Sequence, residues 1–584
     1  MISGKNILYL FLLLFFLVLL TVSCVYNPIR SNTYPDSAIL FKTKKERDNK
    51  GKHVTANGEL RTLIINVVFK DDTTKESKEW GFSKTVLPAW TRTLLNETTI
   101  LEFPHQNVTH YFYEMSGGDF LLYGDVYPKV IVPQYSQSHY KSIGEVNSEI
   151  LTNLDEEIDF SKYDNWSKGD GRKFVNKPDG KVDMIFILYR NFEDHLFFNN
   201  SWTGIAHLYL NEEFITNDGV KIATGRLDKG SGIQSRGGNN GYNYTKYVLA
   251  HEFGHFLFGA FHIENITNLA LMTGGPVWNA SRGMHSWERN KLGWLKYKEI
   301  PLNENSKIEL DDYITTGEAG RIMLSNDEWY VIENHQRISK HDWAKSQGMF
   351  LYHIENAKGF YPKITVKCAD GNWNFEINEK DEKLFKTIPN RFGKTELSFG
   401  HKYKNINYAA YQEVYGDNSA WGDEFDAFNL DYNNLISPVS NPTSNNKAEI
   451  DFAIKIKEEK DNKIVLNLLF KDIYLNTPPS KPQPIEIVKD STGNLKLSWL
   501  KNEEPDLVGY NLYYISTLNS VRSMYFPFTV RSTKLNEFIN IKSNNIIWLT
   551  AVDKDNKESV QSDYFEIIFD SDQNSWRWIR KEKL

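Results

Sequence analysis

Two nearly uninterrupted apolar runs place the strongest constraint on how this chain can fold. They are Leu63-Ile64-Ile65-Asn66-Val67-Val68-Phe69 and Val182-Asp183-Met184-Ile185-Phe186-Ile187-Leu188-Tyr189. A strand that is apolar on both faces must be covered on both faces, which is typical of the central strands of an α/β sheet. Helix-like stretches separate the two runs. The sequence therefore predicts an α/β domain over residues 59–299.

Two further segments of this domain have strand-like patterns. Residues 120–126, Phe-Leu-Leu-Tyr-Gly-Asp-Val, are typical of a hairpin. Residues 204–210, Gly-Ile-Ala-His-Leu-Tyr-Leu, predict a third strand. A helix is then expected to begin near Tyr244 or Thr245.

That predicted helix carries the segment His251-Glu252-Phe253-Gly254-His255. Apolar residues flank it on both sides, namely Val248, Leu249 and Ala250 before it and Phe256, Leu257 and Phe258 after it. Residues four apart lie on one face of a helix, so both histidines point the same way. Two histidines and a glutamate on a buried helix are costly unless they are paired or bound to a metal.

The segment has the residue types and spacing of the helical zinc-protease motif. His251 and His255 are predicted to bind zinc, and a catalytic zinc site keeps one position open for water or substrate. Glu252, next to the first ligand, is predicted to be the general base that takes the proton of the metal-bound water.

A third ligand is required, and two residues compete for it. Gly259 can end the helix and let the chain reverse, which would bring His262 back to the metal. Glu288 lies on a later predicted helix, residues 286–292, as a thermolysin-like site would require. Leu271-Met272-Thr273-Gly274-Gly275 resembles the methionine turn under a metzincin site and favours His262. The usual metzincin spacing places the glycine three residues and the third histidine six residues after the second histidine. Here Gly259 and His262 lie four and seven residues after His255, so the turn contains one extra residue.

The sequence resembles the immune inhibitor A family of metallopeptidases over about residues 60–470. Besides the zinc helix, the segments that carry the resemblance are 111–120, 179–183, 287–294, 330–334, 352–354 and 437–442. The family usually has an acidic residue where this chain has His262. The resemblance implies a secreted zinc endopeptidase that acts on protein or peptide substrates. It also implies that calcium can bind, for which Asp179 and Asp183 are candidates, although a polar turn before a strand explains them more simply.

The pattern of apolar and polar residues changes after residue 300. Alternating runs such as 307–310 and 328–332 predict a β-rich domain over residues 300–476. Thr477-Pro478-Pro479-Ser480-Lys481-Pro482 is a stiff linker. Strand-like runs at 495–499, 508–514 and 546–553 then predict an immunoglobulin-like β-sandwich over 477–570 that resembles a fibronectin type III module, with residues 571–584 as a tail.

The first residues predict export. Lys5, an apolar run through Leu20 and the end Thr21-Val22-Ser23-Cys24 are typical of a signal peptide, and the end resembles a lipoprotein box. Residues 1–24 are thus the predicted signal, and residues 25–58 a polar linker. We expect a surface lipoprotein, with a plain signal peptide or a signal anchor as the alternative.

Composition excludes some other functions. The net charge of −7 gives no reason to expect nucleic acid. Cys24 and Cys368 are the only cysteines, so no disulfide framework exists. The alternative to a peptidase is a catalytically silent surface binding protein or adhesin that keeps the same scaffold.

Overall fold

The computed structural model describes most of the chain between residues 56 and 581. The described residues are 56–73, 80, 84–168, 174–196, 204–260, 262–263, 266, 269–273, 283–357, 362–369, 374–378, 381–388, 425–482, 485–489, 495–515, 521–527, 534–538, 545–570 and 575–581. The chain is multidomain and β-rich, with several separate sheets. The predicted signal peptide with Cys24, and nearly all of the predicted linker, lie outside the described residues.

The first sheet has five strands in the order β2-β1-β5-β9-β6. Its strands are β1 (Gly58–Val67), β2 (Phe120–Ile131), β5 (Ile185–Tyr189), β9 (Gly232–Ser235) and β6 (Gly204–Ile205). β2, β1, β5 and β9 pair in parallel, and β6 pairs antiparallel with β9 at the edge. The two apolar runs of the sequence therefore become central strands, as predicted, and the structure shows that they pair with each other.

Two of the expected strands differ from the prediction. Residues 120–126 do not form a hairpin, because β2 continues to Ile131 and pairs in parallel with β1. The strand predicted at 204–210 ends at Ile205. Tyr209 has a positive φ of 56°, which no strand residue adopts. The carbonyls of His207 and Leu208 accept side-chain hydrogen bonds from Gln234 and Asn147 rather than bonds from a neighbouring strand.

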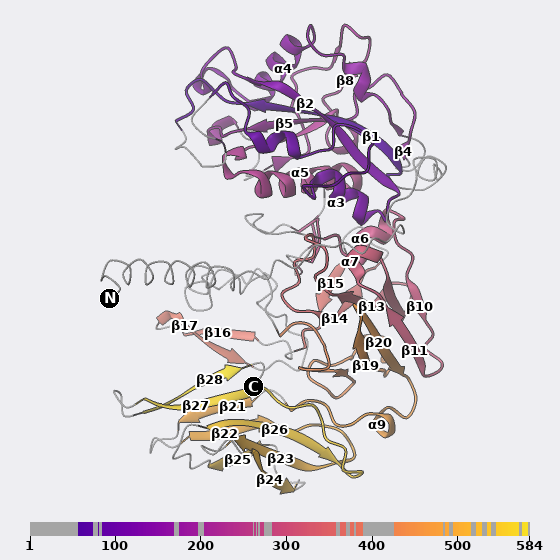
Figure 1. The fold of residues 1–584 in the computed structure, drawn as a ribbon, viewed down its shortest axis with the longest axis vertical. Coiled ribbons are helices and arrows are strands. Elements are labelled where there is room, and N and C mark those ends of the chain that lie inside the picture. The colour runs from indigo at the N-terminus through magenta and orange to yellow at the C-terminus, as the bar shows by residue number, and fades with distance from the viewer. Residues whose placement is uncertain are drawn as a thin grey trace, which may run out of the picture. The chain divides into compact units, whose positions relative to one another are not determined.

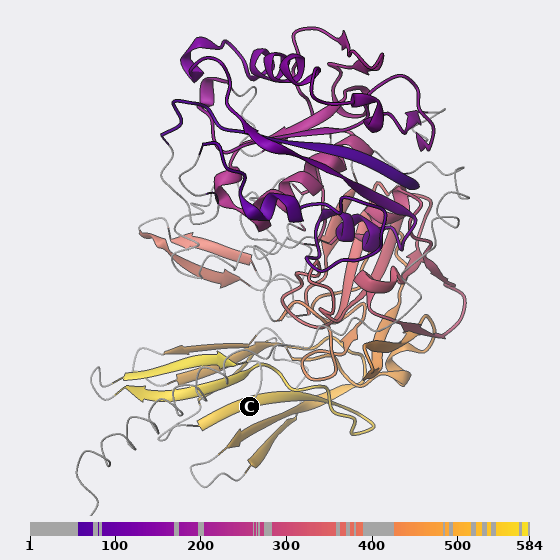
Figure 2. The ribbon, with the colours of Figure 1, turned by 45° about the horizontal axis from the view of Figure 1, so that its top comes forward.

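Helices cover both faces of this sheet (Figures 1 and 2). α4 (Ile143–Leu154) lies on one face, and α3 (Val108–Met115) and α5 (Tyr242–Phe258) lie on the other. Successive side chains of β1 point to opposite faces of the sheet. Ile65 therefore packs in the core cluster with α4, and Ile64 packs in the cluster with α3 and α5.

Two sheets make up the next region. The first has the order β10-β12-β13-β14-β15, with bounds Lys298–Ile300, Ala319–Met323, Glu328–His335, Gly348–Glu355 and Lys363–Val366. The second has the order β11-β20-β19-β18, with bounds Ser306–Leu310, Lys463–Leu469, Ala453–Lys460 and Leu435–Ile436. Short helices α6 (Ser286–Lys291), α7 (Tyr313–Thr316) and α9 (Ile473–Asn476) lie between strands along the chain.

One hydrophobic core continues from the first sheet's helices into this β-rich region. The same cluster contains Phe112 of α3, Phe253 of α5, Val331 of β13 and Tyr352 of β14. Trp287 of α6 adds a hydrogen bond from its indole N–H to the carbonyl of Ala357, at 3.1 Å. Cys368 is a fully buried thiol beside this core.

The C-terminal part consists of two antiparallel sheets that share one core. Their orders are β21-β22-β25 and β24-β23-β26-β27-β28. The bounds are Ile485–Lys489, Leu495–Leu500 and Lys534–Phe538 for the first, and Val521–Pro527, Leu507–Ile515, Asn545–Asp553, Tyr564–Asp570 and Ser575–Lys581 for the second. Trp499 and Tyr510 lie in the shared core, which makes the pair a β-sandwich. β28, in the segment predicted as a tail, pairs with β27.

Smaller hairpins complete the described structure. They are β3 (Ser167–Lys168) with β4 (Phe174–Val175), β7 (Phe214–Ile215) with β8 (Lys221–Ile222), and β16 (Asn374–Asn378) with β17 (Asp381–Ile388). Within the described ranges, the helices are too short or too polar to cross a bilayer.

Candidate metal centre

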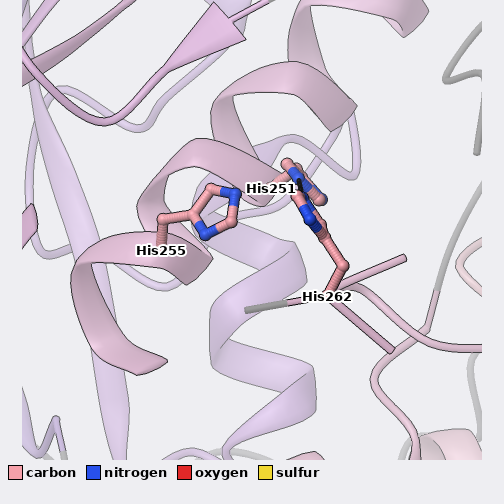
Figure 3. Close-up of side chains that lie close together, drawn as sticks. All are labelled: His251, His255 and His262. Atoms are coloured by element: carbon pink, nitrogen blue, oxygen red, sulfur yellow. Dashed lines mark hydrogen bonds between the residues drawn. The ribbon is translucent and has the colours of Figure 1, made fainter. Parts of the chain in front are cut away.

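α5 presents His251 and His255 on one face, one turn apart (Figure 3). Nδ1 of His251 lies 2.8 Å from the carbonyl oxygen of Leu271, and Nδ1 of His255 lies 2.9 Å from that of Gly259. A carbonyl can only accept, so each Nδ1 carries the proton and each Nε2 keeps its lone pair. Both rings are thus fixed in the form that binds a metal through Nε2.

His262 joins these two histidines from the loop that follows α5 (Figure 3). Gly259 ends the helix with φ 98°, a conformation that a glycine adopts without strain, and the chain then reverses. Nε2 of His262 lies 3.3 Å from Nε2 of His251. Two ligands of one tetrahedral zinc ion are about 3.3 Å apart, given zinc–nitrogen bonds of about 2.0–2.1 Å.

The three histidines together have the spacing of a ligand set. One ring nitrogen from each of His251, His255 and His262 lies within 4.8 Å of the others. His251 and His255 are half-buried, and His262 is exposed. The extra residue in the loop, compared with the usual metzincin spacing, does not keep His262 away from the other two rings.

Glu252 follows His251 on α5 and is buried. Its residue is 4% exposed, and burial raises the pKa of its carboxyl to about 8. The backbone of Gly204 on β6 approaches it closely, because a Cβ at that position would lie 2.6 Å from Oε1 of Glu252. Only a glycine leaves Glu252 its present place, so the edge strand of the sheet helps to position this carboxylate.

The predicted methionine turn packs against the same helix. Met272 is fully buried, and a Cβ on Gly254 of α5 would lie 2.4 Å from its Sδ. Met272 also accepts a hydrogen bond at its carbonyl from the N–H of Ile263, next to His262. The turn therefore contacts both the helix of the first two histidines and the loop of the third. Gly274 and Gly275 lie outside the described residues.

Glu288 lies apart from the group of histidines. It is fully buried, and its carboxylate accepts hydrogen bonds from the backbone N–H groups of Met272 at 2.7 Å, His285 at 2.8 Å and Leu271 at 3.0 Å. Burial raises the pKa of this carboxyl to about 7 although all three bonds lower it. The structure thus places Glu288 where it holds the turn whose Leu271 carbonyl orients His251.

The acidic pair considered for calcium takes part in two turns. Asp183 accepts hydrogen bonds from the backbone N–H groups of Asn165 at 2.7 Å and Trp166 at 2.8 Å. The N–H of Asp179 donates at 2.8 Å to Asp164. These contacts agree with the polar turn that the sequence also allowed.

Sequence reasoning did not identify the groups that support the site. The carbonyls of Leu271 and Gly259 and the close approach of Gly204 act through the backbone. A backbone carbonyl leaves no residue-type signal in a sequence. A glycine in a short strand is the only sequence signal that could have pointed to Gly204.

No family model matches the sequence, and no curated protein matches it. Among solved structures, OgpA from Akkermansia muciniphila is 10% identical over 90% of this chain and 95% of its own, with a TM-score of 0.18. A Fn3-like protein from Clostridium thermocellum is 22% identical over 15% of this chain and 90% of its own, with a TM-score of 0.12. The spore cortex lytic enzyme SleM of Clostridium perfringens is 16% identical over 22% of this chain and 36% of its own, with a TM-score of 0.13. The chain thus spans about a third of the length of SleM. At these TM-scores the chemistry of the site follows from this chain's own residues alone.

Proposed function

We propose that this chain is a zinc-dependent endopeptidase that hydrolyses extracellular protein or peptide substrates. The observation that carries the proposal is the meeting of His251, His255 and His262, with the buried Glu252 next to His251 in the same helix. Three nitrogen ligands leave one position for water and substrate, as in catalytic rather than structural zinc sites.

The residues around the site have separable roles in such a reaction. Zinc bound there would polarise the scissile carbonyl and acidify the attacking water. Glu252 takes the proton from that water as the C–O bond forms, and delivers it to the amine as the C–N bond breaks. The carbonyls of Leu271 and Gly259 keep the rings of His251 and His255 in place.

The finer classification belongs to the same proposal. The glycine turn before His262 and the packing of Met272 under Gly254 support a metzincin-type, immune inhibitor A-like peptidase. The two-sheet core around Trp499 supports a fibronectin type III-like module over residues 477–570. Calcium binding remains a proposal that rests on the family resemblance alone.

The variants Glu252→Gln and His262→Ala test the function. Glu252→Gln keeps the shape but cannot accept a proton, so we expect casein hydrolysis to fall by at least about 100-fold while zinc content and fold stay unchanged. His262→Ala should lose the zinc ion of this centre on dialysis. His353→Gln is the matched control, because His353 also contacts a carboxylate, Glu328 at 2.7 Å, far along the chain from the site.

The outcome separates the peptidase from its alternative. Wild-type activity in Glu252→Gln would contradict the catalytic role. A zinc-loaded wild type that cleaves no protein would instead favour the silent surface binding protein.

Export and lipidation at Cys24 complete the proposal. The apolar run that ends at Cys24 supports it. We expect the mature chain to begin with a diacylated Cys24, and an unmodified mature N-terminus at another residue, seen by mass spectrometry, would contradict this.

A further inference from the structure

A second group of metal-ligand side chains lies in the core, away from the histidines of the candidate centre. It consists of His110 and Glu114 on α3 and His341 in the segment after β13, and one ligand atom from each lies within 4.8 Å of the others. His110 and Glu114 are four residues apart, so both project from one face of α3. Sequence reasoning did not predict this group.

The distances fit one shared cation. Nδ1 of His110 lies 3.1 Å from Nε2 of His341. Two ligand nitrogens on one tetrahedral zinc ion are about 3.3 Å apart, so a small adjustment would accommodate the ion. The other nitrogen of His341, Nδ1, lies 3.4 Å from the hydroxyl of Tyr247. That contact orients the ring with Nε2 towards His110, as the outer contacts of metal-binding histidines do.

The carboxyl of Glu114 supplies the second, independent observation. Its Oε2 accepts a hydrogen bond from the hydroxyl of Ser339 at 2.6 Å, but its Oε1 is buried without a hydrogen-bond partner. The Glu114 residue is 3% exposed. A hydrogen bond between the two rings would explain their separation, but it would leave Oε1 of Glu114 buried without a partner, which is unfavourable. A cation shared with the histidines satisfies it.

The surroundings favour a structural ion rather than a catalytic one. His110 is 6% exposed and His341 is fully buried. The rings of Phe103 and Tyr111 pack on the two histidines, with centroids 5.0 Å from those of His110 and His341 respectively. A dry, aromatic enclosure gives a substrate no access.

Some charged side chains around His110, Glu114 and His341 oppose a bound cation, and others favour one. Lys246 and Lys340 lower the pKa of both histidines and oppose a cation, and Arg289 acts on Glu114 in the same sense. Asp312 and Asp342 raise the pKa of Glu114 and so favour a positive charge beside it. Lys246 is partly accommodated elsewhere, since its ammonium lies over the ring of Tyr247 at 4.5 Å.

We propose that His110, Glu114 and His341 bind a second divalent metal ion, which is zinc or a similar first-row transition metal. This ion links α3 to the segment after β13. Two imidazoles and one carboxylate form a ligand set of borderline softness, which suits zinc better than calcium or magnesium. The fourth position would fall to a small ligand such as water. The proposal stands independently of the peptidase function, because no ligand is shared.

Metal content in a variant that lacks the candidate catalytic ligands tests this site by itself. The background is the full chain with His251→Ala and His255→Ala, and zinc is measured by atomic emission after dialysis against metal-free buffer. We expect two equivalents in the wild type, one in the background, and none when His341→Gln is added. Adding His353→Gln to the background instead should leave one equivalent.

Two further measurements cover the case that the His341→Gln variant does not fold. Glu114→Gln keeps the length of the side chain and the contact with Ser339, and should also remove the remaining equivalent. Cobalt(II) added to the zinc-free background should give the visible absorption of a four-coordinate nitrogen and oxygen site.

The results distinguish the two proposed sites. A background variant that holds no zinc and shows no such cobalt spectrum overturns the second site, and so does a folded His341→Gln variant that keeps its equivalent. Zinc content that is unchanged by His251→Ala and His255→Ala but lost with His341→Gln would overturn the catalytic site and leave this one standing.

Discussion

Replacement of Glu288 by glutamine tests how the candidate catalytic centre is held in place. The carboxylate accepts three backbone hydrogen bonds, with Oε1 bonded to Met272 and Oε2 bonded to Leu271 and His285. In the best orientation of Glu288→Gln, the amide oxygen keeps the two bonds of Oε2. The amide NH₂ of the glutamine then faces the backbone N–H of Met272. The hydrogen bond that Met272 donates to Oε1 is lost, and two hydrogen-bond donors face each other.

The expected loss follows from these bonds. A hydrogen bond to a charged group contributes about 1.5–3 kcal/mol, and a buried donor left unsatisfied adds a similar cost. Glutamine removes part of the cost of burying a carboxylate whose pKa is raised to about 7, which offsets some of the loss. We expect the free energy of unfolding to fall by about 2 kcal/mol. Because the Leu271 carbonyl orients His251, zinc affinity should fall by about 10–100-fold.

Urea unfolding and competition with a zinc chelator measure the two effects. Glu299→Gln is the matched control, because Glu299 is an exposed carboxylate paired with Arg321 and the loss of this pair should change stability by no more than about 1 kcal/mol. Stability and zinc affinity equal to wild type in Glu288→Gln would refute the role given to the three bonds. Zinc lost from Glu288→Gln but kept by His262→Ala would show that Glu288 is the third ligand after all.

Two other substitutions have consequences that the structure defines. Gly204→Ala places a methyl group against Glu252 and should lower peptidase activity by about 100-fold, while zinc content stays at the wild-type level; wild-type activity would show that the close approach does not position the carboxylate. For His335, burial alone would lower the pKa from 6.5, but the carboxylates of Asp342 and Glu333 raise it to about 10. Its proton therefore stabilises the fold fully below about pH 6.5, and this stabilisation is lost as the pH rises towards 10. His335→Gln should lower the free energy of unfolding by about 3 kcal/mol at neutral pH. Urea titrations at higher pH should show a smaller difference between the variant and the wild type. A difference that grows with pH would contradict this reasoning.

Local patterns were sufficient to predict the elements that carry the first two histidines. The buried strands β1 and β5 and the helix α5 follow from apolar runs and from i, i+4 spacing, which depend on neighbours in the chain. The position of His262 followed from one further local feature, the glycine turn at Gly259. The family resemblance and the export signal remain predictions.

Contacts between distant residues explain what the sequence did not predict. His110 and His341 are separated by 231 positions, and no local spacing relates them. The parallel pairing of β2 with β1 is also non-local, whereas the local sequence of residues 120–126 indicates a hairpin. The strand expected at 204–210 stops early because side chains of Asn147 and Gln234, remote in sequence, take its carbonyls. Pattern alone cannot supply such partners.

The core that continues from α3 and α5 to β13 and β14 limits how this protein can be divided by recombination. A crossover near residue 299 would separate Phe253 from Val331 and remove Glu333, whose carboxylate accepts the N–H of Ser286 at 2.8 Å. The α6 segment would then lose a partner while it holds Glu288 in place. A chimera that exchanges the C-terminal sandwich at the proline-rich segment leaves that core whole. We therefore expect a chimera to fold when the α/β and β-rich regions come from one parent, whereas an exchanged sandwich has to keep only a few polar contacts such as that of Lys481 with the Tyr432 carbonyl.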